Sequence, residues 1–425
     1  MDSLFLGSRF APAVREGMLK ALHESLSTVD ADTCAILLSG GLDTSVIADA
    51  VQAARVERVE RRKGVEEAEK AEGDTKQEKL QNSVTSQGFK HAITVCVSTA
   101  TSQTDAPWID LPYAEAIVRK HAPTIKHHVL AVENPMDDLM KGDILEFCVR
   151  TLQSFDPMDL RGGVAVAHAI KYAQANGFKT IVTGDAADEL FAGYSFLISL
   201  SDVKMRKWIK RYVGNYSFSA VPLGEACGIK VIQPFIHPAV IEAALKCNKS
   251  DLVGPDPTDP SLQHGKYVLR AAFPEATSRW RKKVPLETGC NTTPLGAEFE
   301  AGADLEWLKA QKAEVYSTYG IDLWGGMEHL HYFRVFEKIF AERLEAKSVV
   351  ETTTLKTEDS NDAPAEQFAF PTPNVSWKTK SPRFGSDPCI KCGFQLDRKE
   401  QYFCRTCGAW PARHGGVPQD TEEED

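Results

Sequence analysis

Long apolar segments are missing from this sequence. No run approaches the roughly 18–20 apolar residues of a membrane-spanning helix, so we do not expect an integral membrane protein. The first twenty residues mix acidic and basic side chains around no compact apolar core, and a signal peptide is therefore not expected. A weak role of this segment in organelle targeting stays open.

Positive charge is also in short supply. The 425 residues include 49 lysines and arginines against 59 aspartates and glutamates, and the formal net charge is −10. This balance argues against broad, nonspecific binding of nucleic acid, although a local basic patch is compatible with it. The length predicts two to three domains, and no internal repeat is visible.

The ten cysteines fall into two groups. Four of them lie close together near the end of the chain. The others are scattered, several in apolar runs typical of buried free thiols: Cys34, Cys96, Cys148, Cys227, Cys247 and Cys290. This usage indicates a reducing, intracellular compartment, and we expect a cytoplasmic protein without a disulfide scaffold.

Short apolar runs alternate with segments of helical periodicity in the first half of the chain. Strands are predicted at residues 34–38, 92–97, 127–132 and 180–183. Helices are predicted between them, at residues 113–121, 143–154 and 164–176. Such βαβ units predict an α/β fold, in which a parallel sheet is covered by helices on both faces. From about residue 195 the pattern is mostly helical.

Two segments without apolar periodicity divide the chain. Residues 55–90 are crowded with charged side chains, which indicates a solvated helix extension or a disordered insertion, with a docking role as the alternative. Residues 347–385 are rich in Thr, Pro, Ser and acidic residues and indicate a flexible linker. The predicted organisation is therefore a main domain over 1–346, this linker, a small cysteine-based domain over 386–414 and an acidic tail over 415–425.

The stretch Ser39-Gly40-Gly41-Leu42-Asp43-Thr44-Ser45 follows the first predicted strand and precedes a helical pattern. Backbone N–H groups and the positive end of a helix dipole meet at such a turn and make an anion site. Asp43 can hold Mg²⁺ against phosphate oxygens. The loop lacks the lysine of a Walker A sequence. It resembles the PP-loop of ATP pyrophosphatases, which adenylate a substrate and release pyrophosphate; a plain β–α turn is the alternative.

A second polar loop, from Gly184 to Tyr194, follows the fourth predicted strand. Three of its residues within five positions are carboxylates, Asp185, Asp188 and Glu189, and would repel one another strongly without a cation. We therefore expect a second metal-binding group beside that of the first loop. Ligands of parallel sheets bind beyond the carboxyl ends of the strands, where both loops are predicted.

With both motifs present, the chain resembles the synthetase domain of asparagine synthetases and of the related β-lactam synthetases. Their second signature is close to Gly-Glu-Gly-Ser/Ala-Asp-Glu-Leu/Val-Phe-Gly-Gly-Tyr. Further similar stretches follow the family's order between about residues 10 and 345: Asp156–Arg161, Gln233–His237, Lys266–Arg270 and Trp280–Pro285. The resemblance implies a PP-loop fold of the adenine nucleotide alpha hydrolase-like kind.

The resemblance also implies a role for each matching residue. Lys283 would stabilise the negative charge that develops during adenylation. Asp185 and Glu189 would be the other catalytic residues, and Asp43 and Asp188 would bind Mg²⁺. ATP would lie against Leu38, Ser39, Gly40, Gly41, Asp43, Thr44, Ser45, Val97 and Gly184.

Three positions depart from the family pattern. Asparagine synthetases begin with a glutaminase domain whose nucleophile is a cysteine at the second position, whereas this chain has Asp2 and about thirty residues before the first strand. We expect the chain to use free ammonia, another amine or a partner that delivers nitrogen. Asp185 stands where the family has a glutamate, and its side chain is shorter by about one methylene group. His237 stands where the family often has an aspartate. It is either a structural residue or an indication that the substrate differs. An interpretation as solvated surface cations stays open for Lys283, Lys266 and Arg161.

Cys389-x-x-Cys392 and Cys404-x-x-Cys407 are separated by eleven residues. Two such knuckles place four thiolates for tetrahedral Zn²⁺, and so short a segment does not fold without the metal. A structural zinc ribbon is predicted, with a redox dithiol or an iron–sulfur site as the alternative. Basic residues in and around the ribbon would permit docking of RNA or protein: Lys391, Arg398, Lys399, Arg405, Arg413 and His414.

The leading hypothesis is an ATP-dependent, AMP-forming carbon–nitrogen ligase. It would adenylate a carboxylate, release pyrophosphate and let ammonia or another amine attack, as the resemblance to asparagine synthases implies. Its cofactors would be ATP, Mg²⁺ and structural Zn²⁺, and its partners small-molecule acids and amines, together with a nitrogen-donor or other partner protein. One alternative is a PP-loop tRNA-modifying enzyme whose ribbon binds RNA. Another is an ATP-binding regulator or scaffold without catalysis, against which the intact Asp43, Asp188 and Lys283 argue.

Overall fold

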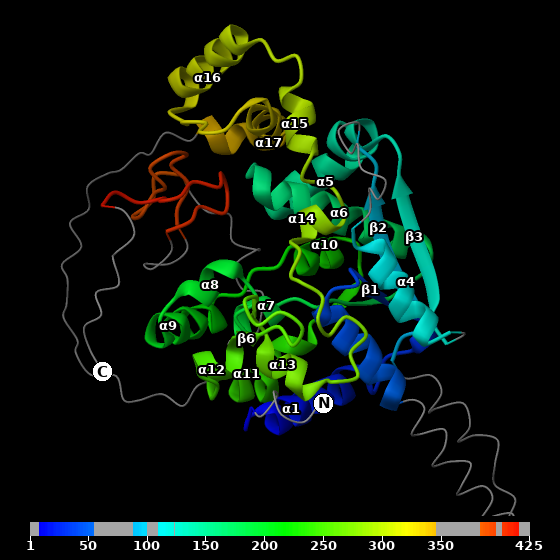
Figure 1. Ribbon diagram of the computed structural model, residues 1–425. Coiled ribbons are helices and arrows are strands. Elements are labelled where there is room, and N and C mark those ends of the chain that lie inside the picture. Colours follow the sequence, from blue (N-terminus) through cyan, green and yellow to red (C-terminus); the bar gives the residue numbers. More distant parts are fainter. Residues whose placement is uncertain are drawn as a thin grey trace, which may run out of the picture. The chain divides into compact units, whose positions relative to one another are not determined.

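A computed structural model describes residues 8–54, 88–99, 109–122, 124–345, 383–396 and 402–415 of the chain (Figure 1). Residue contacts divide the chain into two compact units. Unit 1 comprises Met1–Ile144 and Gly162–Leu295, and unit 2 comprises Leu145–Arg161 and Gly296–Asp425. Asp2, most of the predicted insertion and linker, the acidic tail, Arg398 and Lys399 lie outside the described residues, and the predicted domain boundaries stay predictions.

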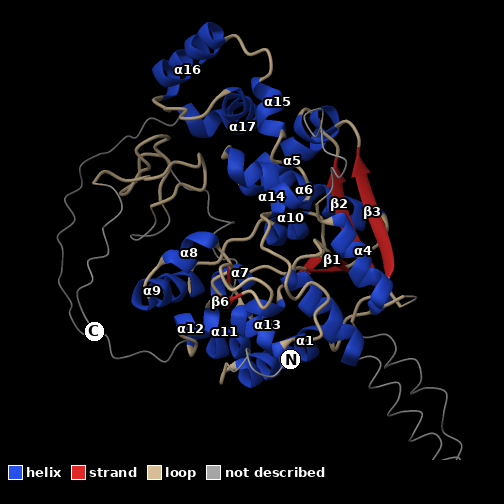
Figure 2. Ribbon diagram, in the orientation of Figure 1, coloured by secondary structure: helices blue, strands red, loops and turns tan. Residues whose placement is uncertain are grey.

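Unit 1 is built on a five-stranded parallel sheet with the strand order β3-β2-β1-β4-β5. Figure 2 labels three of its strands, β3, β2 and β1. Its strands are Cys34–Leu37 (β1), His91–Val97 (β2), Lys126–Val132 (β3), Thr180–Val182 (β4) and Lys230–Ile232 (β5). Ala35 of the central strand pairs with His91 of β2 on one side and with Ile181 of β4 on the other. The residues of β1 and β4 are almost all buried, as expected for strands covered on both faces. The sheet confirms the predicted α/β class.

The two edges of the sheet differ from its centre. β3 has partly exposed residues along most of its length, including Lys126 and Leu130, which is typical of an edge strand. β5 is not among the predicted strands, because it begins at the exposed Lys230 and only its last residue is buried. Its pairing with β4 extends the sheet beyond the four strands that the sequence predicts.

Helices surround this sheet in unit 1. In α1 the buried residues Val14, Met18 and Leu22 recur every four positions and form the stripe that packs inward. A further helix follows the glycine loop, and its described part covers residues 42–54. The others are Leu111–Lys120 (α4), Ala187–Leu190 (α7), Ser195–Ser199 (α8), Asp202–Val213 (α9), Ala220–Ala226 (α10), Pro238–Leu245 (α11), Lys249–Leu252 (α12), Tyr267–Ala272 (α13) and Leu286–Gly289 (α14), with α1 at Ala11–Leu26.

Shorter elements complete unit 1, and two helices cross its boundary. The short elements are the 3₁₀ turns Ala31–Thr33 (η1) and Pro234–Ile236 (η3), the π turn Met136–Met140 (η2), and the antiparallel pair Gly254–Pro255 (β6) and Gln263–His264 (β7). Asp143–Leu152 (α5) and Pro157–Ala175 (α6) cross between the units. α6 begins seven residues before the predicted start, because Pro157 suits the first turn of a helix and the pair Gly162-Gly163 is tolerated inside it.

Unit 2 contains the C-terminal helices and the cysteine segment. Its helices are Leu295–Glu300 (α15), which begins at the last residue of unit 1, Leu305–Tyr319 (α16) and Met327–Glu345 (α17). Two antiparallel bridges, between Arg383 and Phe394 and between Pro388 and Gln395, organise the cysteine segment. The described part of this segment thus includes Arg383, which precedes the predicted ribbon.

Two global properties follow from the described residues. None of the helices found there combines the length and the apolar character that a membrane span requires. All ten cysteines are described, and all are free thiols in buried positions.

Candidate active site and candidate metal centre

The glycine loop, residues 38–45, connects β1 to the following helix. Gly40 has a φ of +69°, and a Cβ atom there would lie 2.5 Å from a backbone nitrogen of α4, so a larger residue does not fit. The hydroxyl oxygens of Ser39 and Thr44 lie 3.3 Å apart, and the Gly41 N–H donates to Ser39 Oγ. Because N–H groups in the first turn of a helix lack acceptors within the helix, this turn is suited to an anion.

Residues more than two hundred positions away hold the glycine loop in place. The Ser278 hydroxyl donates to Gly40 O at 2.6 Å, and Arg281 Nη1 donates to Ser39 O at 3.0 Å. Arg281 also forms an ion pair of 2.5 Å with the carboxylate of Asp110, whose pKa is raised by burial in spite of this partner. The sequence indicates Arg281 only as a member of a family-like stretch, and its contact with the loop is not predicted.

Asp49 ties the helix after the loop to the same distant segment. Its buried carboxylate accepts hydrogen bonds from Ser45 Oγ at 3.0 Å and from the Thr277 N–H at 2.7 Å. It also lies 2.5 Å from His121 Nε2 and 2.8 Å from Lys120 Nζ. Burial opposes ionisation, but the hydrogen bonds with His121 and Lys120 outweigh it and lower the pKa of Asp49 to about 2. Since the hydroxyl of Ser45 is used here and its N–H donates within the loop, Ser45 positions the loop.

We expect Asp49→Asn to lower the free energy of unfolding by about 2–3 kcal/mol at neutral pH, because its donors lose a charged acceptor at a buried site. The loss of free energy of unfolding should be smaller than for a fully buried ion pair, because Lys120 is 40% exposed and solvent screens its charge. The pKa of Asp49 is lower in the folded state than in the unfolded state. Its contribution to the free energy of unfolding is therefore present above about pH 4 and is lost as the pH falls toward about 2. Urea unfolding should therefore show a smaller difference between variant and parent at pH 3 than at pH 7. An equal difference at both pH values would contradict this, and Asp32→Asn, at an exposed ion pair, is the control.

The second polar loop leaves β4 and touches the glycine loop. A Cβ atom at Gly184 would lie 3.0 Å from Asp43 Cβ and 3.2 Å from Thr44 Cγ2. Gly193, at the far end of the second loop, leaves no room for a Cβ atom either, because that atom would collide with Asp188 and Lys266. The two glycines therefore allow the side chains of both loops to meet.

Two lysines join the carboxylates of the two loops. Lys266 Nζ lies 2.6 Å from Asp43 Oδ2 and 2.7 Å from Asp188 Oδ1, and Lys283 Nζ lies 3.0 Å from Asp188 Oδ2. Lys266 precedes α13 with a φ of +58° and is only 3% exposed, so it is a buried member of the site and not a helix-surface lysine. Lys283 keeps 35% of its side chain exposed. The sequence places Lys266 only in a family-like stretch, and its ion pairs are not predicted.

The charges in this cluster compensate one another. Burial raises the pKa of Asp43, although Lys266 opposes the shift. At Asp188 burial acts in the same direction, but the two lysines Lys266 and Lys283 outweigh it and lower the pKa of Asp188. The two carboxylates in turn raise the pKa of Lys266 against the effect of its own burial. The repulsion that the sequence predicts is thus balanced by lysines, and by itself it does not require a metal ion.

The same cluster nevertheless fits a divalent cation. Oxygen atoms of Asp43 and Asp188 converge on one point, the position of Lys266 Nζ, from distances of 2.6–2.8 Å. Among the described residues, the buried Asp188 Oδ1 has this ion pair and no hydrogen bond. Carboxylate oxygens are the ligands that Mg²⁺ takes from proteins, so Asp43 and Asp188 are suited to share one ion.

The other two candidate catalytic carboxylates are held by hydrogen bonds. Asp185 Oδ2 accepts from Thr183 Oγ1 at 2.6 Å and from Gln233 Nε2 at 2.8 Å, and burial raises the pKa of Asp185. Glu189 Oε1 accepts from the Tyr194 hydroxyl at 2.5 Å, and burial raises the pKa of Glu189 to about 7. Gln233 is a site residue that the sequence does not single out, and its place in the family-like stretch that ends at His237 is the signal that points to it.

The residues expected beside adenosine have backbone groups that are already bonded. Leu38 N–H donates to Ile93 O at 2.8 Å, and Leu38 O accepts from Thr94 Oγ1 at 2.7 Å. Val97 O accepts from Asn291 Nδ2 at 2.8 Å. Leu38 and Val97 therefore offer mainly apolar contact at the carboxyl ends of β1 and β2.

Residues 13–221 match the family model described as asparagine synthase. A probable glutamine-hydrolysing asparagine synthetase of Dictyostelium discoideum is 23% identical over 345 residues, which cover 77% of this chain and 55% of that protein. Glutamine-hydrolysing asparagine synthetase 1 of Saccharomyces cerevisiae is 24% identical over 359 residues, which cover 80% of this chain and 59% of that protein. A probable asparagine synthetase of Schizosaccharomyces pombe is 24% identical over 325 residues, which cover 72% and 52%.

The chain thus spans between half and three-fifths of the length of these asparagine synthetases. The family match includes the glycine loop and the loop after β4, with Asp43 and Asp188. It ends before Lys266 and Lys283, which the structure adds to the site.

Two further positions from the family-like stretches have structural partners. His237 Nδ1 accepts the Ala239 N–H at the start of α11, and His237 Nε2 lies 2.9 Å from Glu24 Oε2. These contacts favour the structural interpretation of His237. In unit 2, Arg161 pairs with Glu328 at 3.2 Å and is partly buried, so it is not a fully solvated cation.

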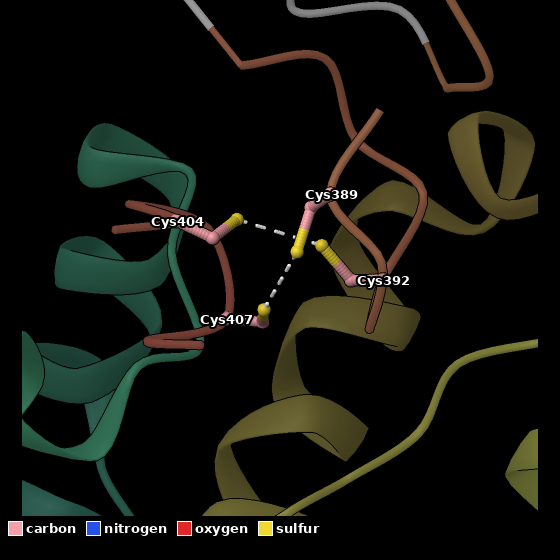
Figure 3. A group of neighbouring side chains, drawn as sticks. All are labelled: Cys389, Cys392, Cys404 and Cys407. Carbon is pink, nitrogen blue, oxygen red and sulfur yellow. Dashed lines mark hydrogen bonds between the residues drawn. The ribbon is translucent and has the colours of Figure 1, made fainter. Parts of the chain in front are cut away.

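The four clustered cysteines converge in unit 2. Figure 3 shows the sulfur atoms of Cys389, Cys392, Cys404 and Cys407 pointing toward one another. All four sulfur atoms lie within 4.8 Å of one another. A glycine of positive φ follows each pair, with +73° at Gly393 and +74° at Gly408. The Lys391 N–H donates to Cys389 Sγ at 3.4 Å. The cluster can hold one metal ion, and four thiolates in this arrangement favour zinc.

The cysteine segment is bonded to the helical part of unit 2. The Phe155 N–H donates to Thr406 O at 2.7 Å, and Trp324 Nε1 donates to Cys407 O at 2.8 Å. The buried guanidinium of Arg383 donates to carbonyl oxygens near the ends of α16 and α17, at 2.6 and 2.8 Å. These hydrogen bonds join the cysteine segment to the helices of unit 2.

Proposed function

We propose that this chain is an ATP-dependent, AMP-forming carbon–nitrogen ligase of the asparagine synthase type. It would activate a carboxylate as an acyl-adenylate, release pyrophosphate and let ammonia or another amine displace AMP. The observation that carries the proposal is the meeting of two loops from neighbouring parallel strands, with Lys266 and Lys283 bound to their carboxylates. The family match and the asparagine synthetase relatives support the same class of reaction.

In this proposal residues 38–45 form a PP-loop for the pyrophosphate part of ATP. Its backbone N–H groups and the hydroxyls of Ser39 and Thr44 would bind the phosphates. Gly184 lies against Asp43 and Thr44 and would border the nucleotide, as would Leu38 and Val97 through apolar atoms. Ser278, Arg281 and Ser45 would act indirectly, by holding the loop in shape.

Asp43 and Asp188 would hold Mg²⁺ in the nucleotide complex. The ion would neutralise phosphate charge and help pyrophosphate to leave. Lys266 Nζ occupies the point on which the two carboxylates converge, so binding of the ion would require this ammonium group to shift. Until then Lys266 neutralises the like charges of two largely buried carboxylates, Asp43 and Asp188, in the folded protein.

Lys283 would stabilise the charge that grows on the α-phosphate when the acyl-adenylate forms and when it breaks down. A positioned ammonium group acts most strongly where charge develops in the transition state. Its partial exposure leaves Lys283 able to turn from Asp188 toward a bound nucleotide. The partly buried Asp185 and the buried Glu189, which lie next to Asp188 in the sequence, would orient the attacking amine.

We further propose that the four cysteines hold a structural Zn²⁺. The metal would fix the two knuckles, and the knuckles would fix the segment around Phe155 and Trp324 through Thr406 and Cys407. Four thiolates complete a tetrahedral site and leave no open position for catalysis.

The alternative of RNA binding through the ribbon loses two of the cations on which it depends. Lys391 pairs with Asp322 at 2.5 Å, and Arg413 pairs with the carboxylate of Asp387. The alternative of a regulator without catalysis is less well supported, because the two loops lie together in the described site and both lysines are bound to their carboxylates.

A screen for pyrophosphate release tests the ligase proposal. The full chain is incubated with ATP, Mg²⁺ and a panel of carboxylic acids, with ammonia or other amines, and the products are identified by mass spectrometry. We expect pyrophosphate and AMP to appear only with a particular acid, together with its amide, and Asp43→Asn to abolish both because it removes a cation ligand. The exposed Asp137→Asn is the matched control and should keep its activity. ATP binding without turnover across the whole panel would favour the regulator.

A further inference from the structure

Helix α9 concentrates positive charge in a chain whose net charge is −10. Its inner residues Met205 and Ile209 are buried and fix it to unit 1, where it packs against α7, α11 and α12. Five of its twelve residues are cations: Lys204, Arg206, Lys207, Lys210 and Arg211. Arg206, Lys207 and Lys210 are exposed, and their spacing places them on one face of the helix.

Stabilisation of the helix itself does not explain why α9 carries so many cations. Cations in the last turn, such as Lys210, are favoured by the helix dipole, but Lys204 lies in the first turn, where the dipole opposes a cation. The single acidic residue of the helix, Asp202, pairs with Arg206 at 3.3 Å. Both side chains are more than 40% exposed, so this pair contributes little to stability. The helix itself therefore carries five cations against one carboxylate.

Aromatic rings adjoin these cations. Phe196 of α8, which is 50% exposed, stacks on Tyr194 with ring centroids 5.6 Å apart and planes tilted by 12°. Its ring also meets the Trp208 ring edge-on at 5.6 Å. Trp208 stacks on Tyr212 one helical turn away, at 4.9 Å and 17°. Aromatic rings of α8 and α9 thus lie on the same part of unit 1 as the cations of α9.

We propose that this surface, formed by α8 and α9, binds a single-stranded nucleic acid. Its phosphates would lie on the cations of α9, and a base would stack on the exposed face of Phe196. An acidic polypeptide would match the charge equally well, but it offers a flat group only at its aromatic residues, whereas every nucleotide carries a flat base. The exposed ring of Phe196 therefore favours a nucleic acid. The surface reaches the candidate active site, since Tyr194 also binds Glu189. The proposal does not depend on the ligase reaction.

Binding of a fluorescent oligouridylate to the full chain, followed by anisotropy at several salt concentrations, tests this surface. Each phosphate contact contributes about 0.7 to the slope of log affinity against log salt for single strands. The double variant Lys207→Ala/Lys210→Ala should therefore reduce the slope by about 1.4. Phe196→Ala should raise the dissociation constant about fivefold at constant salt, because a stacked base is lost. Lys20→Ala, an exposed lysine on α1, is the matched control and should change neither quantity.

Three results would overturn the proposal. The first is the absence of binding at high protein concentration and low salt. The second is binding that neither the lysine pair nor Phe196→Ala weakens, because the oligonucleotide then occupies another surface. The third is equal binding of labelled polyglutamate that Phe196→Ala leaves unchanged, which would assign the surface to an acidic protein partner.

Discussion

Lys283→Ala is expected to lower acid-dependent pyrophosphate release about 10²–10³-fold while the protein stays folded. The magnitude is typical of the loss of one group that stabilises developing charge in a transition state. Folding should survive because Lys283 is 35% exposed and Asp188 keeps Lys266 as a partner. Steady-state kinetics should place the loss mainly in kcat, since an interaction made in the transition state alone is removed.

Two other lysines are compared with Lys283: Lys282 as the control and Lys266 as a contrast. Lys282→Ala changes the same charge at the adjacent exposed position and should leave turnover within about twofold, as for a surface substitution. Lys266→Met should behave differently, because it removes the ion pair of the largely buried Asp43 and leaves Asp188 paired with Lys283. We expect it to lower the free energy of unfolding by about 3–5 kcal/mol. Unchanged turnover in a folded Lys283→Ala protein would refute the role given to this residue.

Removal of metal from the cysteine cluster is expected to unfold the ribbon. Structural zinc contributes on the order of 10–16 kcal/mol in zinc-finger peptides, far more than a segment of this size gains from its own apolar core. Because the Phe155 N–H donates to Thr406 O, its amide should lose protection from hydrogen exchange when the metal is removed. The same loss is expected in Cys404→Ser, which removes one of the four converging sulfur atoms.

Metal analysis distinguishes the possible contents of this cluster. One zinc per chain in the parent protein, and none in Cys404→Ser, is the expected result. Cys227→Ser, which alters a buried thiol outside the cluster, should retain the metal. Iron with inorganic sulfide, or a metal-free chain in which the amide of Phe155 stays protected, would exclude the structural zinc site.

The central strands could be predicted from the sequence because they carry an unambiguous signal. β1 and β4 are continuous apolar runs that end at polar, glycine-containing loops, and burial on both faces requires such runs. β5 carries no such signal, since it begins at the exposed Lys230 and is specified by pairing with β4. α6 shows the same limit, because packing tolerates Gly162 and Gly163 inside a helix whose local pattern begins later.

The glycine loop and the carboxylates could be identified in the sequence because the residues of each motif are contiguous. The cation between them could not, because Lys266 is 223 positions from Asp43 and reaches it only through the tertiary fold. Its side chain also enters the site from a residue with a φ of +58°, which no local pattern predicts for a lysine. Gln233 and Arg281 are further cases in which a side chain acts on a loop distant in sequence.

The central claim is that a substrate carboxylate attacks the α-phosphate of ATP. Once the acid is known, its carboxylate is labelled with oxygen-18, and the AMP formed during amide synthesis is examined by mass spectrometry. Attack on the α-phosphate leaves one carboxylate oxygen on the phosphorus, so each AMP should carry one labelled oxygen, with none in pyrophosphate. Label in inorganic phosphate together with ADP, or unlabelled AMP during amide formation, would contradict adenylation.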